Sequence, residues 1–119
     1  MAHSGMLRAS CESLKIDIDM RVVVDASSTC AVTHYRELIA FTDALLSQDR
    51  LALEQTREQL RKVVGDAGVA RAAAVAGNFQ LMNRALDTVG ATFGDKLPSR
   101  VAKMAEQFGI SPPSHWTRP

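Results

Sequence analysis

Two cysteines and three histidines are the residues in this 119-residue sequence that could carry out thiol or imidazole chemistry. Cys11 and Cys30 are isolated from each other and form no C-x-x-C motif, in which one thiol attacks and its neighbour resolves the product. Cys30 is followed four residues later by His34, and a helix through both would place them one turn apart. A neighbouring imidazole favours the thiolate, which is the nucleophilic form. The alternative for Cys30 is a buried side chain that packs like a small apolar residue.

His3 and His115 lie near the two ends of the sequence. His3 is a candidate for a proton relay, and the alternative is an exposed residue near a frayed terminus. His115 has no second metal ligand close to it in the sequence, so we expect no metal site. The sequence has no glycine-rich phosphate loop, and we expect no cofactor.

The elements that must position these residues are predicted to be helices. Apolar residues recur at steps of three or four over most of the chain, which is the period of an amphipathic helix. The predicted helices span residues 2–14, 33–47, 50–64, 67–90 and 99–109. Asp49 is placed to cap the third of them, and Gly65 with Asp66 separates the third from the fourth. We therefore predict an all-α fold.

Residues 16–25 are ambiguous. Ile16, Ile18 and Met20 alternate with polar residues as in a strand, and three consecutive valines follow. No second strong strand pattern exists with which this segment could pair, and a lone strand leaves its backbone hydrogen bonds unmade. We therefore interpret the segment as a helix.

The stretch from Ala67 to Gly90 is the longest helical pattern in the sequence. Its apolar stripe consists of Ala72, Val75, Ala76, Phe79, Met82, Leu86 and Val89. The first half is rich in alanine, whose small side chain lets a neighbouring helix approach closely. This pattern favours a helix that belongs to the scaffold and to an interface between subunits.

Length and composition are those of a small globular protein. We expect one domain over residues 1–110 and an extended, proline-containing tail over residues 111–119. Trp116 in the tail has no core to enter, so it packs on a partner subunit or lies in a disordered end. The net charge of +1 gives no case for binding nucleic acid or an anionic membrane. Without an apolar run of about 20 residues or a signal peptide, we expect a cytoplasmic protein with reduced thiols.

Two strings between His34 and Gly90 resemble the C-terminal half of the AhpD-like family, which is related to carboxymuconolactone decarboxylase. The first, ELIAFTDALLSQD, resembles the family pattern ALLxFAxxLTxD. The second, VARAAAVAGNFQLMNRALDTVGATF, resembles the pattern ILEAVAVxAxFNxxNRxADALG. The residues that match the second pattern include Asn78, Phe79, Met82, Asn83, Arg84 and Leu86. The resemblance covers about half the chain and implies a compact AhpD-like helical bundle, here of five to six helices.

The chemistry of that family lies in a C-x-x-C-x-x-x-H helix upstream of these strings, and two registers are open for it here. In the first, AHSGMLRAS matches the segment that begins at the motif histidine, so His3 takes that place and the cysteines would precede Met1. In the second, Cys30 and His34 supply half of the motif and Ser27 replaces the first cysteine. The second register leaves no room for the helix that separates the motif from ELIAFTDALL, so we prefer the first.

Neither register gives this chain the two thiols of the family's peroxidase cycle. The resemblance therefore implies a truncated or degenerate member with weak or no peroxidase activity. One alternative is a thiol-dependent hydroperoxide reductase that uses Cys30 or Cys11 alone, with a hydroperoxide as substrate and an external thiol as reductant. The other is a non-enzymatic helical oligomerisation module. The family commonly assembles through such helices, so the expected partner is a second copy of the chain.

Overall fold

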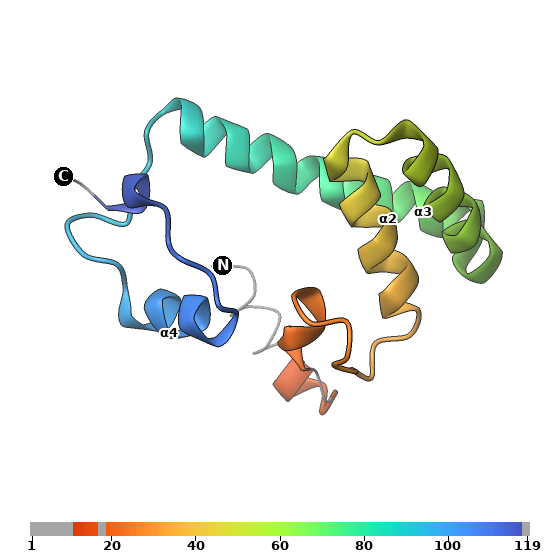
Figure 1. The fold of residues 1–119 in the computed structure, drawn as a ribbon, viewed down its shortest axis with the longest axis horizontal. Coiled ribbons are helices and arrows are strands. Elements are labelled where there is room, and N and C mark those ends of the chain that lie inside the picture. The colour runs from red at the N-terminus through yellow and green to blue at the C-terminus, as the bar shows by residue number, and fades with distance from the viewer. Residues whose placement is uncertain (1–10, 17–18, 118–119) are drawn as a thin grey trace. The chain divides into compact units, whose positions relative to one another are not determined.

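The computed structural model of the protein describes residues 11–16 and 19–117, and within these ranges every regular element is helical (Figure 1). The α-helices that are described in full are α2 (Tyr35–Ser47), α3 (Arg50–Thr88) and α4 (Ser99–Gln107). Two short 3-10 helices, η1 (Met20–Val23) and η2 (Ser114–Trp116), lie at either end of this series. The predicted all-α class is confirmed. Of the helix predicted over residues 2–14, residues 11–13 are helical and the part before them lies outside the described residues.

The chain divides into two units, each of which is described by itself. The middle unit comprises Val32–Leu86 and holds α2 and most of α3. The terminal unit comprises Met1–Ala31 together with Asp87–Pro119, and holds η1, α4 and η2. Among the described residues, no helix combines the length and the apolar character that crossing a membrane requires.

The two ends of α2 and the start of α3 are set by backbone conformation and by a side-chain cap. His34 precedes α2 in a left-handed conformation with φ 58°, and Gln48 follows it with φ 63°. The backbone N–H of Ala52 donates to Asp49 Oδ1 at 3.0 Å, which satisfies one of the free N–H groups at the start of α3. The predicted cap at Asp49 is confirmed.

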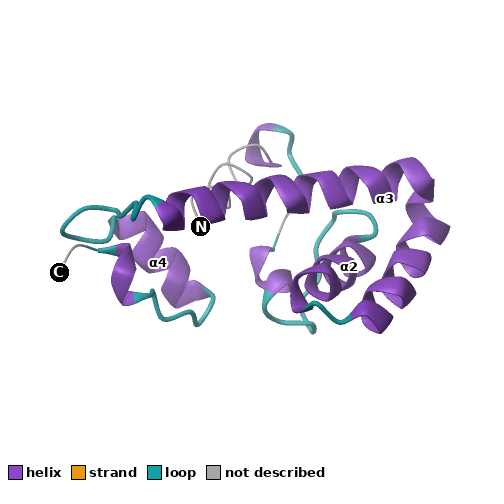
Figure 2. Ribbon diagram, turned by 90° about the horizontal axis from the view of Figure 1, so that it is seen from above, coloured by secondary structure: helices purple, strands orange, loops and turns teal. Residues whose placement is uncertain are grey.

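A kink at Gly65 divides α3 into two helical segments (Figure 2). Gly65 has φ 71° and ψ 175°, a conformation that is essentially restricted to glycine because a Cβ would clash with the backbone. The predicted break between residues 64 and 67 is therefore confirmed. Next to the kink, Asp66 Oδ1 accepts a hydrogen bond from Arg61 Nε at 2.7 Å.

The core of the middle unit is formed where α2 meets both segments of α3. Phe41, Leu60 and Val69 are buried, one from each of these three helical segments. Partly buried side chains surround them: Leu38, Leu45, Leu53, Val64, Ala72 and Ala73. The cluster thus draws on the second segment only as far as Ala73, in the first two turns after the kink.

The apolar stripe predicted for the second segment continues beyond this core. Val75 is 57% exposed and Leu86 is 51% exposed, and more than a third of the surface of Phe79 and of Met82 is exposed. The residue that the segment buries most is Val69, which the predicted stripe did not include. The stripe overlaps the buried face at Ala72, which packs on the core, while Val75 and Leu86 of the stripe are exposed.

The helix α4 gives the terminal unit its clearest amphipathic element. Val101 and Ala105, four residues apart on one face, are both buried. The helix ends in a Schellman motif, in which Gly109 N–H donates to the Glu106 carbonyl and Ile110 N–H donates to the Ala105 carbonyl. Gly109 has φ 64°, as this motif requires. The predicted last helix and its glycine stop are confirmed.

The tail packs within its own unit. The backbone N–H of Phe93 donates to the carbonyl of Trp116 at 2.8 Å, and the two rings meet edge-on. The expectation that Trp116 has no partner inside its own chain was wrong, because the connector after α3 supplies Phe93. The tail also contains the single turn η2, so it is not extended throughout.

The ambiguous segment 16–25 is neither a strand nor an α-helix where it is described. It contains only η1, one 3-10 turn, and residues 17 and 18 lie outside the described residues. Asp19 caps this turn by accepting from Arg21 N–H at 3.0 Å. Of the helix favoured over residues 16–25, the structure shows only this single 3-10 turn in the described part of the segment.

Candidate functional site

The residues proposed for catalysis do not share a helix. Cys30 lies in a stretch without helical structure, and His34 is the residue that precedes α2. The four-residue spacing therefore does not correspond to one helical turn, which was the condition for the imidazole to face the thiol. Cys30 belongs to the terminal unit and His34 to the middle unit. His3 lies outside the described residues.

Both cysteines of the chain are free thiols. Cys11 is buried, and Cys30 is partly exposed. A hydroperoxide must reach a thiolate in order to be reduced, so access favours Cys30 over Cys11. The two thiols form no disulfide with each other.

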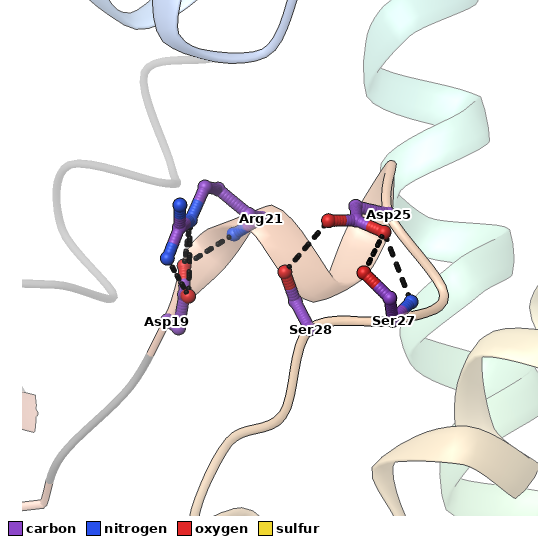
Figure 3. A network of polar contacts seen from close by, with 5 residues as sticks. All are labelled: Asp19, Arg21, Asp25, Ser27 and Ser28. Carbon is purple, nitrogen blue, oxygen red and sulfur yellow. Dashed lines mark hydrogen bonds and ion pairs between the residues drawn. The ribbon is translucent and has the colours of Figure 1, made fainter.

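The segment that precedes Cys30 is held by a small polar network (Figure 3). Asp25 Oδ1 accepts from the backbone N–H of Ser27 at 2.9 Å and from its hydroxyl at 2.7 Å. Asp25 Oδ2 accepts from the Ser28 hydroxyl at 3.1 Å. Ser27, which replaces the first cysteine in one register of the family motif, is thus a turn residue.

These hydrogen bonds lower the pKa of the Asp25 carboxyl group. The Ser27 hydroxyl, followed by the Ser27 N–H and the Ser28 hydroxyl, lowers the pKa of Asp25, because each donor stabilises the ionised carboxylate. At the other end of the network, the hydrogen bonds and the charge of Asp19 raise the pKa of the Arg21 guanidinium. Both groups are exposed, so the network orders a turn and shows no sign of a tuned acid–base site.

No cluster of three metal-binding side chains occurs in the part of the chain that the structure describes. The described residues offer no combination of cysteine, histidine and carboxylate with which to hold an ion.

A groove in the middle unit lies between α2 and the segments of α3 around the kink. Its volume is about 660 Å³. The α2 wall consists of Leu38, Thr42 and Leu46. The α3 wall consists of Val64, Ala67, Gly68, Arg71, Ala72, Val75, Ala76, Phe79 and Gln80. We call this hollow the α2–α3 groove.

The α2–α3 groove was not predicted, although the sequence carries a signal for it. Small residues recur at helical steps on one side of α3, at Gly68, Ala72 and Ala76, and leave space beside the helix. Gly68 also permits the kink to close, because a Cβ at this position would lie 2.5 Å from Val64 Cβ. The volume of the groove lies within the range of small-molecule sites.

Comparison with known proteins identifies no relative of this chain: no family model, no curated protein and no solved structure matches it.

Proposed function

We propose that the protein is a degenerate member of the AhpD-like family that keeps the helical scaffold and has weak or no peroxidase activity. The observation that carries this proposal is the state of the two cysteines: Cys11 is buried, Cys30 lies on a non-helical stretch, and both are free. Without a resolving thiol, a sulfenic acid would persist or be oxidised further. Ser27, which bonds to Asp25, cannot act as that thiol.

The helices support the family assignment through their positions in the sequence. The string ELIAFTDALLS falls within α2, and residues 69–88 of the second string lie on the second segment of α3. We propose that these two helices are the family's paired scaffold helices and that the full AhpD-like bundle has five to six helices. In this proposal α2 and the second segment of α3 belong to the scaffold, and these 119 residues contain no C-x-x-C motif.

Hydroperoxide consumption in the presence of a dithiol reductant tests the proposed loss of activity. We expect the 119-residue chain to consume cumene hydroperoxide no faster than the double variant Cys11→Ser/Cys30→Ser. Turnover that disappears in Cys30→Ser and persists in Cys11→Ser would overturn the proposal in favour of a single-cysteine hydroperoxide reductase. Loss in Cys11→Ser alone would also establish thiol-dependent activity.

A second candidate function is a non-enzymatic oligomerisation module. It is favoured by the exposed apolar side chains in the last turns of α3 beyond the α2–α3 groove, where Leu81 is 70% exposed and Leu86 is 51% exposed. Such side chains mark protein interaction surfaces when they are contiguous. Light scattering at micromolar concentration tests this candidate, and Leu86→Glu should shift an oligomer toward monomer. A wild-type chain that is monomeric under these conditions would contradict it.

A further inference from the structure

The walls of the α2–α3 groove are mostly apolar. Eight of its twelve lining residues are Leu, Val, Ala or Phe, namely Leu38, Leu46, Val64, Ala67, Ala72, Val75, Ala76 and Phe79. Thr42, one of the few polar residues, has its hydroxyl engaged, since Oγ1 donates to the carbonyl of Leu38 at 2.8 Å. An apolar ligand would therefore gain free energy by leaving water for this groove.

Arg71 is the single charged residue that lines this groove. Its guanidinium has no hydrogen bond or ion pair with any residue in the described ranges. By contrast, Arg61 on the same helix is held by both Glu58 and Asp66. The sequence from Ala67 to Leu86 contains no aspartate or glutamate at all, so no carboxylate on that stretch of α3 can neutralise Arg71.

The apolar walls and the guanidinium of Arg71 together indicate which class of ligand the groove fits. Small-ligand sites are mostly apolar and use a few polar groups to orient the ligand. A guanidinium stays ionised at any physiological pH and binds carboxylates through paired N–H donors. A ligand that complements the α2–α3 groove thus has a single anionic group attached to an apolar body.

We propose that the α2–α3 groove binds a free long-chain carboxylate, with the carboxylate at Arg71 and the alkyl chain along Val75, Ala76 and Phe79. From Arg71 to Gln80 the helix rises by roughly 13 Å, at about 1.5 Å per residue. That length suits an extended chain of medium to long fatty-acid type. The site stands independently of the proposed family membership, because it rests only on the packing of α2 against α3.

Calorimetric titration of the full chain with dodecanoate, below its critical micelle concentration, tests the proposal. We expect saturable binding at one site per chain. The affinity should rise roughly fourfold for each methylene added from octanoate to dodecanoate, as burial of the chain requires. Arg71→Gln should weaken dodecanoate binding about tenfold through the loss of a charge-assisted hydrogen bond, and leave dodecanol binding unchanged.

Arg57→Gln is the matched control, because Arg57 lies on the first segment of α3 outside the groove lining. This variant should bind dodecanoate as the wild type does. Val75→Glu keeps the fold, since Val75 is 57% exposed, and places a carboxylate in the wall of the groove. It should abolish dodecanoate binding and favour dodecyltrimethylammonium, with an unchanged circular dichroism spectrum.

Several results would overturn the proposal. Equal affinities of Arg71→Gln and Arg57→Gln for dodecanoate would remove Arg71 from the site. Binding to anionic vesicles without binding to monomeric dodecanoate would assign the groove to a membrane surface. The wild-type chain could instead form a dimer that Val75→Glu disrupts and that dodecanoate does not affect. That result would assign the groove to a second copy of the chain.

Discussion

Phe93 and Trp116 are joined both through the backbone and through their rings. The Phe93 N–H donates to the Trp116 carbonyl at 2.8 Å, and the ring centroids lie 5.8 Å apart at an interplanar angle of 68°. Edge-on aromatic pairs at this separation contribute about 0.5–1.5 kcal/mol beyond the area that they bury. The contact closes a loop that contains α4, so it ties the tail to the connector that follows α3.

Trp116 is the only tryptophan of the chain, so its fluorescence reports this contact directly. We predict that Phe93→Ala shifts the emission maximum to longer wavelength, because the indole loses its aromatic neighbour and gains contact with water. The control is Phe79→Ala, which removes an aromatic ring from the middle unit and should leave the emission unchanged. Equal spectra for wild type and Phe93→Ala would show that the ring of Phe93 does not shield Trp116.

The elements that could be predicted from the sequence are those whose signals are local. Asp49 at the start of α3, Gly65 at the kink and Gly109 after α4 each act on backbone groups within a few residues of themselves. Capping and positive φ angles depend on residue type more than on tertiary context, so the pattern alone identifies them. The helix predicted over residues 33–47 also agrees with α2, because its apolar residues recur at helical steps within one short stretch.

Features that depend on contacts between distant residues could not be predicted in this way. The pairing of Phe93 with Trp116 and the burial of Val69 depend on which elements meet, and periodicity does not contain that information. The candidate site shows the same limit: the spacing of Cys30 and His34 had meaning only inside a helix, which is absent there. The α2–α3 groove likewise depends on which side chains of α2 meet those of the two segments of α3, and periodicity does not show this.

The kink of α3 provides a prediction about backbone conformation. Gly65→Ala should lower the free energy of unfolding by about 1–3 kcal/mol, because a Cβ is strained at φ 71° and ψ 175°. Urea denaturation followed by circular dichroism measures the change. Beyond Gly65 and its two chain neighbours the added methyl group meets no atom within 4 Å, so the loss would arise from local backbone strain and not from a collision with a packed side chain.

Gly77→Ala is the matched control for this experiment. Gly77 lies inside the second segment of α3, and a Cβ there also meets nothing within 4 Å. Since alanine has the higher helix propensity, this substitution should stabilise the protein by about 0.5–1 kcal/mol. If both substitutions changed stability in the same direction, the assignment of the kink to Gly65 would be wrong.

The core of the middle unit provides a prediction about packing. Leu60 is 0% exposed and lies at the centre of the cluster, so Leu60→Ala should cost about 2–5 kcal/mol through lost burial and the cavity that remains. Leu81→Ala makes the same chemical change at a side chain that is 70% exposed, and should alter stability by less than about 0.5 kcal/mol. Similar effects of the two substitutions on the urea midpoint would contradict the assigned core.

The polar network before Cys30 provides a prediction about pH. Hydrogen bonds from Ser27 and Ser28 lower the pKa of Asp25 in the folded chain, below the value of about 3.9 expected when it is unfolded. A lowered pKa in the folded state means that this contribution to stability is fully present above the unfolded pKa. It is lost as the pH falls through the folded pKa.

NMR titration of the side-chain carboxyl carbons measures this shift. The midpoint of Asp25 should lie below the usual aspartate range, and Ser27→Ala should raise it toward that range by removing the hydroxyl donor, which has the largest effect. Ser28→Ala should raise it less, because the Ser28 hydroxyl is the more distant donor at 3.1 Å. An Asp25 midpoint that stays in place in Ser27→Ala would mean that the turn does not hold its hydrogen bonds in solution.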